Sequence, residues 1–124
     1  MINRVNLDNF AKYINPHARV LLQEYKLSIK NKMWVTSIIL SLTIIDNIFS
    51  DDYSLEYIDG LDLNQFKKSK DLHWLRHRRN KILHYEGPID GFFENNDSMN
   101  VLKQDALRAN NIINRCFEKL FKSI

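Results

Sequence analysis

Residues 33–49 restrict the fold of this chain most, because apolar side chains would cover nearly every side of a helix built from them. A helix that is apolar all round belongs in the centre of a bundle. The many β-branched residues would also permit a strand, but about 17 residues is long for one and no hairpin signal adjoins the segment. Asp46 stands inside this segment, and such a carboxylate must either reach water at the helix end or find a buried partner. The apolar positions are Trp34, Val35, Ile38, Ile39, Leu40, Leu42, Ile44, Ile45, Ile48 and Phe49.

The rest of the chain also shows helical rather than strand periodicity. Only three Gly and two Pro interrupt the 124 residues, of which 44% are hydrophobic. We therefore expect an all-α fold in a single domain covering residues 1–124. Expected helices cover residues 7–14, 16–29, 62–66, 71–86 and 98–122, with a loop over 50–60 and an irregular segment over 89–96. Their expected N-caps are Asn6, Asn15, Asp62, either Ser69 or Asp71, and either Asp97 or Ser98.

Apolar stripes are expected on the first and last long helices. Residues 16–29 carry Val20, Leu21, Tyr25, Leu27 and Ile29 at helical spacing. The closing helix carries Met99, Leu102, Ala106, Leu107, Ile112, Ile113, Cys116, Phe117, Leu120 and Phe121. The lone cysteine of this stripe, Cys116, is expected to fill core space, which fits a reducing cytoplasm.

Charge is distributed unevenly although the formal net charge is only +3. Residues 46–62 contain acids and no lysine or arginine, so the chain is polarised between an acidic and a basic segment. Asp71 is the one acid among the basic residues Lys67, Lys68, Lys70, Arg76, Arg78, Arg79 and Lys81. The lysines among residues 67–70 are expected to be a solvated charge run.

The basic segment 71–86 should place most of its polar groups on one helix face. At 100° per residue, His73, His77, Asn80 and His84 fall within about 60°, with Arg76 and Lys81 on the flanks. Leu72, Leu75, Ile82 and Leu83 fall on the opposite side. Arg79 is the exception, because it lies about 140° from His84 on the apolar side. Guanidinium groups hold phosphates and an imidazole exchanges a proton near neutral pH, so this face suits a phosphodiester.

The pattern Arg79-Asn80-x-x-x-His84, after Trp74-Leu75-Arg76 and ahead of Gly87, resembles the motif of HEPN domains. In architecture the resemblance extends over about residues 16–124, and in residue identity over 75–84. It implies a four- or five-helix up-and-down bundle with an acid in an apolar helix and the motif on a later helix.

The resemblance implies a metal-independent endoribonuclease that acts as a homodimer through the motif helix, in a toxin, antitoxin-regulated or phage-defence setting. Arg79 and His84 would be the catalytic pair, oriented by Asn80, with no cofactor. RNA would supply the 2′-hydroxyl nucleophile and the product would be a 2′,3′-cyclic phosphate. Substrate would be held by Arg76, His77, Arg78, Lys81 and His73. Some relatives carry a tyrosine two residues after the histidine as a site of modification, whereas here Tyr85 follows His84 directly and Glu86 takes the next place.

Other interpretations remain open from the residues themselves. Arg79 can be a structural arginine that is paired with an acid such as Asp46, and Arg76 and Arg78 are then rival phosphate ligands. The whole domain can bind RNA, a nucleotide or an acidic protein without catalysis. Trp74 and Tyr85 can stack on bases, although partly buried packing or a dimer contact is favoured.

A zinc site and a membrane location are both disfavoured by the sequence. His73, His77 and His84 lack an accompanying acid on their face and a cysteine pair, so no metal site is expected. The longest uncharged run, residues 33–45, is shorter than the about 20 apolar residues that cross a bilayer. The amino terminus lacks the apolar core of a signal peptide, and a cytoplasmic protein is expected.

Overall fold

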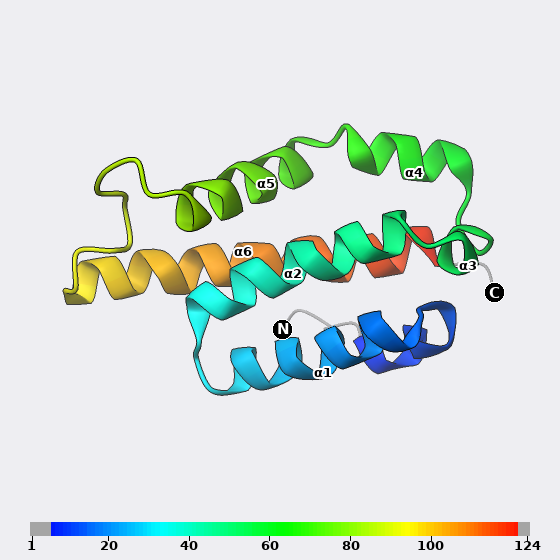
Figure 1. Cartoon of the computed structure of the whole chain (residues 1–124), viewed down its shortest axis with the longest axis horizontal. Helices are drawn as coiled ribbons and strands as arrows, with labels where there is room; N and C mark the ends of the chain where they lie inside the picture. The colour runs from blue at the N-terminus through cyan, green and yellow to red at the C-terminus, as the bar shows by residue number, and fades with distance from the viewer. Residues whose placement is uncertain (1–5, 122–124) are drawn as a thin grey trace.

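The computed structural model describes residues 6–121, and every regular element in that range is helical, without a strand. The elements are a 3₁₀ helix η1 and six α-helices, drawn in Figure 1. Their bounds are η1 Leu7–Tyr13, α1 Pro16–Lys30, α2 Trp34–Phe49, α3 Asp52–Leu55, α4 Gly60–Lys67, α5 Lys70–Leu83 and α6 Asn96–Leu120. The expected all-α fold is confirmed.

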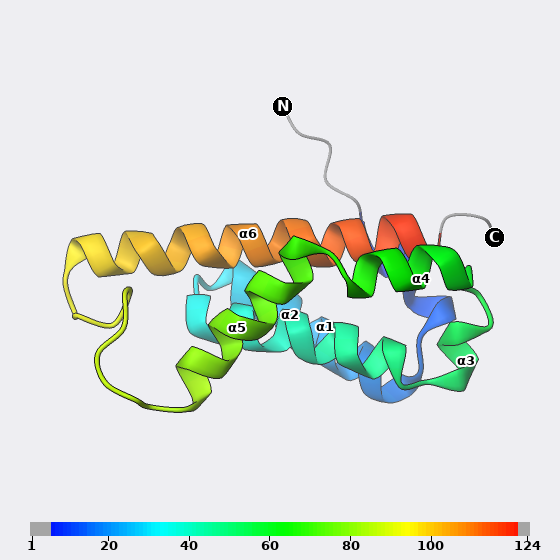
Figure 2. The same ribbon diagram turned by 90° about the horizontal axis from the view of Figure 1, so that it is seen from above.

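The four long helices form an up-and-down bundle around α2. Figures 1 and 2 show α2 beside α6, with α1 on one side of α2 and the α4–α5 layer on the other. Successive long helices α1, α2, α5 and α6 alternate in direction, so α5 runs opposite to both of the helices on which it packs. The bundle therefore holds α5 as an outer helix with one face toward the core and one toward solvent.

The central position expected for residues 33–49 is confirmed by the burial of α2. Helix α2 packs against both α1 and α6, which explains why the apolar pattern surrounds it. Each of its fully buried aliphatic side chains stabilises the fold by about 1.5–3 kcal/mol. They are Ile38, Leu42, Ile44, Ile45 and Ile48.

Helix α1 confirms its expected apolar stripe at Tyr25, which is buried, and at Leu21 and Ile29, which pack against the core. Val20 and Leu27 are 59% and 53% exposed, so the expected stripe is wrong at these two positions. The buried residues of the helix are Ala18, Leu22, Tyr25 and Ser28, of which Tyr25 belongs to the expected stripe. The Oγ atoms of Ser28 and Ser37 on α2 lie 2.9 Å apart, a close approach of the two helices that only small residues permit.

The caps of the first two helical elements are as expected, whereas two later ones differ. Asn6 caps η1, and the Asn15 side chain accepts a hydrogen bond from the Ala18 N–H at 2.8 Å. Helix α4 is capped by Asp59 instead of the expected Asp62, because the Asp59 carboxylate accepts from the N–H groups of residues 61 and 62. Helix α6 is capped by Asn95 rather than by Asp97 or Ser98.

The Ser98 hydroxyl is occupied elsewhere. It accepts a hydrogen bond from the Phe93 N–H at 3.1 Å, while the Asn95 side chain accepts from the Ser98 N–H at 2.8 Å. Ser98 therefore joins the first turn of α6 to the preceding loop, and the helix begins two residues earlier than expected.

The segment 50–60, expected as a loop, contains the short helix α3. The Ser54 hydroxyl of α3 donates to the Tyr13 carbonyl at 2.8 Å and ties this segment to η1. In the range 6–121, none of the helices combines the length and the apolar character needed to span a membrane. The expected burial of Cys116 is confirmed, since its side chain lies in the core with no exposed surface.

Candidate functional site on helix α5

Helix α5 begins where the sequence predicts but ends earlier. The Ser69 hydroxyl accepts from the Leu72 N–H at 3.2 Å and caps the first turn. The last helical residue is Leu83, and His84 already has an extended backbone with φ −114° and ψ 100°. The expected end near residue 86 is therefore wrong by three residues, and His84 lies at the helix terminus rather than within the last turn.

The core-facing side of α5 is formed by Leu72, Leu75, Arg79 and Ile82, which follow one another at spacings of three and four. Leu72 and Leu75 are buried and Ile82 is partly buried against the core. Leu83 is 53% exposed, contrary to its expected place on the apolar side, because the helix ends there and the chain leaves the bundle. Arg79 thus occupies a position that helix geometry assigns to an apolar residue.

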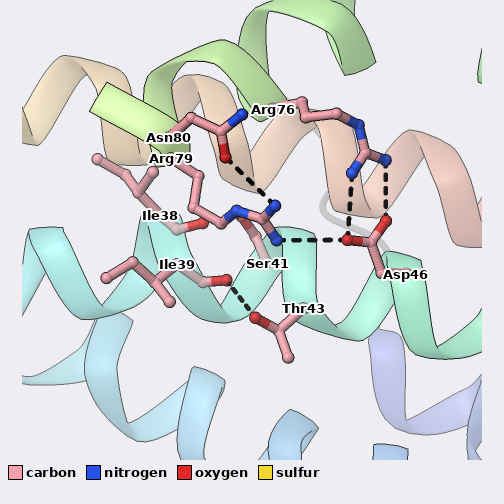
Figure 3. A network of polar contacts seen from close by, with 8 residues as sticks. All are labelled: Ile38, Ile39, Ser41, Thr43, Asp46, Arg76, Arg79 and Asn80. Carbon is pink, nitrogen blue, oxygen red and sulfur yellow. Dashed lines mark hydrogen bonds and ion pairs between the residues drawn. The ribbon is translucent and has the colours of Figure 1, made fainter. Parts of the chain in front are cut away.

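Arg79 and Arg76 both bind Asp46 of α2. Figure 3 shows the two guanidinium groups reaching from α5 toward this carboxylate. Arg76 donates through two nitrogens at 2.9 and 3.3 Å, and Arg79 donates through Nη1 at 3.3 Å. The partner that an acid in this apolar helix requires is therefore supplied by α5. Two cations and one carboxylate leave the group with one net positive charge, available to an anion.

Arg79 also has limited contact with its neighbour in the motif. Its Nη2 lies 3.4 Å from the side-chain oxygen of Asn80, a long hydrogen bond. Its side chain is 21% exposed, and its buried Nε has no hydrogen-bond partner among residues 6–121. Arg79 is thus held in place by Asp46 and retains unused donor capacity.

Arg78 points to the other side of α5. Its Nε donates to Asp105 of α6 at 2.8 Å, and its Nη2 donates to the Asp90 carbonyl at 2.7 Å. Only 12% of its side chain is exposed. Arg78 and Arg79 are therefore both paired within the chain, on opposite flanks of the helix.

The outward face of α5 contains the polar residues that the helical projection places there. His73, His77, Asn80 and Lys81 are exposed, and His84 is exposed just beyond the helix. Within residues 6–121 the three imidazoles make no hydrogen bond or ion pair, and Lys81 makes one distant contact with Glu86 at 3.7 Å. The candidate site is thus an exposed imidazole face flanked by the Asp46-bound arginines, and His84 and Arg79 lie on different sides of one chain.

The two aromatic residues that flank the basic segment have different environments. The Trp74 ring is partly buried and the Arg108 guanidinium lies 4.1 Å from its centre, which confirms packing for this residue. Tyr85 is 83% exposed, so the prediction of partly buried packing is wrong for this residue. Of these two rings, that of Tyr85 is the one free to meet a ligand or partner.

Sequence reasoning missed the partners of Arg78. Asp105 flanks the apolar stripe of α6 between Leu102 and Ala109, and an acid at the edge of such a stripe is the signal that could have found it. The carbonyl of Asp90 lies in a loop, and its direction cannot be deduced from periodicity.

A hollow of about 300 Å³ elsewhere on the surface contains none of the predicted site residues. It is lined by Asp62, Gln65, Phe66, Ser69, Asp71, Arg115 and Lys119. In the described part of the chain, no group of three or more His, Cys, Asp or Glu side chains is arranged to hold a metal ion. Comparisons with models of known protein families, with curated proteins and with solved structures yield no match.

Proposed function

We propose that this chain is a metal-independent endoribonuclease of the HEPN type that works as a homodimer. The observation that carries the proposal is the fixed position of Arg79, which Asp46 holds beside Asn80, together with the exposed His84 at the end of the same helix. These are the three residues of the motif, and each retains the donor or acid–base group that the chemistry needs.

The reaction requires little from the protein because RNA carries its own nucleophile. A base removes the proton of the 2′-hydroxyl, the 2′-oxygen attacks phosphorus, and the bond to the 5′-oxygen breaks as that oxygen takes up a proton. His84 would exchange these protons. The Arg79 guanidinium would stabilise the negative charge that gathers on the phosphorane oxygens.

A dimer is part of the proposal because one chain presents these groups on different sides. Arg79 faces α2, whereas His84 lies at the exposed end of α5. Two copies with their α5 helices side by side would place the His84 of one chain near the arginines of the other. Arg76, with its side chain 42% exposed, and Lys81, His73 and His77 would then bind the phosphates that flank the scissile bond.

The decisive experiment incubates RNA with the protein in the presence of a metal chelator. The wild type should cleave and leave a 2′,3′-cyclic phosphate, and His84→Ala should lose at least about 100-fold in rate, the usual contribution of a general acid or base. His17→Ala is the matched control, because His17 is an exposed histidine on α1, and it should cleave like the wild type. Equal cleavage by His84→Ala, or cleavage only with added metal, would contradict the proposal.

A second candidate function is an RNA- or nucleotide-binding domain without catalysis. It is favoured by one observation, namely that Arg76, Arg78 and Arg79 each bind an acid within the chain. This function predicts that RNA is retarded in a gel by the wild type and by His84→Ala alike, and that neither yields product.

A further inference from the structure

The hollow of about 300 Å³ that contains none of the motif residues lies between α4 and α6, and we call it the α4–α6 hollow. Helix α4, the start of α5 and the C-terminal half of α6 line it. Figure 2 shows α4 alongside this half of α6, with the turn into α5 next to both helices. Its volume is at the lower end of the range for sites that bind small molecules.

The lining of the hollow is polar. Phe66 is its one aromatic residue and is only 6% exposed, while every other lining residue is charged or has a hydrogen-bonding side chain. An apolar ligand would remove water from these groups without replacing its hydrogen bonds. A nucleobase would find no open ring on which to stack. The hollow therefore suits a small polar molecule.

The charges of the hollow indicate which ionic group this molecule should carry. Asp71 is already bound by Arg115 at 2.6 Å and lies 3.9 Å from Arg108. Asp62 also has an interaction within the chain. The Lys119 ammonium, in contrast, makes no hydrogen bond or ion pair with any of residues 6–121. An incoming amine would meet acids that are already engaged, whereas an anion would meet a free cation.

Arg115 keeps donors for the same anion. It binds Asp71 through Nη1, while its Nε and Nη2 make no hydrogen bond in the described part of the chain, and its side chain is 55% exposed. Lys119 follows Arg115 by four residues, so the two cations lie on one face of α6. A phosphate monoester has three acceptor oxygens and about −1.5 to −2 charges at neutral pH, which suits an arginine and a lysine together.

Helix α4 and the start of α5 provide groups of another kind. The Gln65 amide can both donate and accept, and it has no hydrogen bond within the described residues. The Ser69 hydroxyl accepts from the Leu72 N–H at 3.2 Å and keeps its own proton to donate. The Asp62 carboxylate accepts through two oxygens. Hydroxyl groups, which donate and accept, are complementary to this set.

We propose that the α4–α6 hollow binds a small phosphorylated sugar or polyol. The phosphate of this ligand binds Lys119 and Arg115, and its hydroxyl groups bind Gln65, Ser69 and Asp62. This is a site for a free small molecule, additional to the proposed RNA site on α5. It does not depend on the proposed function, because the hollow shares no residue with the motif.

Calorimetric titration of the purified chain with glycerol 3-phosphate, ribose 5-phosphate and glucose 6-phosphate tests the site. At least one of the three should bind saturably, with one ligand per chain. Lys119→Met should weaken this binding by at least about tenfold, because a hydrogen bond between two charged groups is lost. Lys103→Met replaces an exposed lysine of the same helix outside the hollow, so it is the matched control and should bind within about twofold of the wild type.

Half-ligands and a second variant test the sugar part separately. The unphosphorylated parent compound and inorganic phosphate should each bind at least about tenfold more weakly than the phosphorylated compound, because each makes only part of the hydrogen bonds. Gln65→Ala should weaken binding of the phosphorylated compound by about fivefold and leave the affinity for inorganic phosphate unchanged. Urea titration of each variant shows that the fold is intact.

Three results would overturn the proposal. The first is that none of the three phosphorylated compounds binds at millimolar concentration. The second is equal binding by Lys119→Met and the wild type, and the third is equal affinity for the phosphorylated compound and for inorganic phosphate. If a 5′-phosphorylated RNA oligonucleotide binds through Lys119 while the three compounds do not, the hollow belongs to RNA instead. The titrations contain no RNA, so a chain that binds the ligand without cleaving RNA contradicts the ribonuclease function alone.

Discussion

Arg79 occupies a core-facing position of α5 and donates to the Asp46 carboxylate of α2 across 3.3 Å. Arg76 binds the same carboxylate from the next turn at 2.9 Å. Asp46 therefore holds two cations at one point between α2 and α5, where either could meet a phosphate. The structural role of the Asp46 carboxylate and the proposed catalytic role of Arg79 can therefore be tested by separate substitutions.

Asp46→Asn should destabilise the bundle by about 1 kcal/mol, because two guanidinium groups lose their counter-charge while the side chains remain partly exposed to water. The free energy of unfolding from urea titration measures this effect. Glu24→Gln, at an exposed acid of α1, is the control and should change stability by less than about 0.5 kcal/mol. An unchanged stability of Asp46→Asn would show that the carboxylate contributes little to holding α5.

Arg79→Met should leave stability within about 1 kcal/mol of the wild type, because methionine suits a core-facing position and Asp46 keeps its bonds to Arg76. If Arg79 stabilises the phosphorane, the same substitution should lower RNA cleavage by about 100-fold or more. Chelator-containing RNA assays and urea titration on one sample separate the two effects. Arg115→Met, at an exposed arginine of α6, should retain full cleavage; a fully active Arg79→Met would assign Arg79 a structural role only.

Sequence periodicity predicts the long helices well because their apolar patterns are strong, and it predicts the partner of Asp46 because a buried charge needs one. It fails at two positions of the expected stripe of α1. The apolar pattern predicts that Val20 and Leu27 are buried, yet the helix buries Ala18 and Ser28. The cause is the close approach of α1 to α2 at Ser28 and Ser37, a tertiary contact that hydrophobicity alone does not encode.

The candidate site was predictable in composition but not in geometry. The helical projection gives the exposed face with His73, His77 and Asn80, and the inward direction of Arg79. It cannot give the early end of α5 at Leu83 or the bond from Arg78 to the Asp90 carbonyl, which is made across a loop. Contacts of this kind depend on how the whole bundle positions α6 beside α5.

Cys116 should resist thiol reagents in the folded protein, because burial raises the pKa of its thiol above the ordinary value of 9.0 and keeps it protonated. The unfolded chain releases this proton more readily, so the contribution of Cys116 to stability is complete below pH 9 and is lost as pH rises above it. Labelling with a chromogenic disulfide reagent should be slow in buffer and rapid in denaturant. The stability of Cys116→Ala should fall less than that of the wild type as pH rises above 9, because this thiol is absent. Fast labelling of the folded wild type would contradict the prediction.

Arg78→Ala should destabilise the protein by about 2 kcal/mol or more, because it leaves Asp105 without its partner in a largely buried pair and frees the Asp90 carbonyl. The loop formed by residues 84–95 should then open, and limited proteolysis should cut within it faster than in the wild type. Urea titration and mapping of the first cleavage site measure the two effects.

The matched control for Arg78→Ala is Arg115→Ala. Arg115 also binds an aspartate, Asp71, at 2.6 Å, but its side chain is 55% exposed, against 12% for Arg78. Water screens an exposed pair and competes for its hydrogen bonds, so removing it should cost less than about 1 kcal/mol. Within residues 6–121, Arg115 makes no hydrogen bond or ion pair with the loop 84–95, so Arg115→Ala should show the wild-type rate of cleavage in that loop. Equal losses of stability in the two variants would mean that burial does not strengthen the Arg78 pair. Unchanged cleavage of residues 84–95 in Arg78→Ala would mean that Gly91 and Ser98 hold this loop instead.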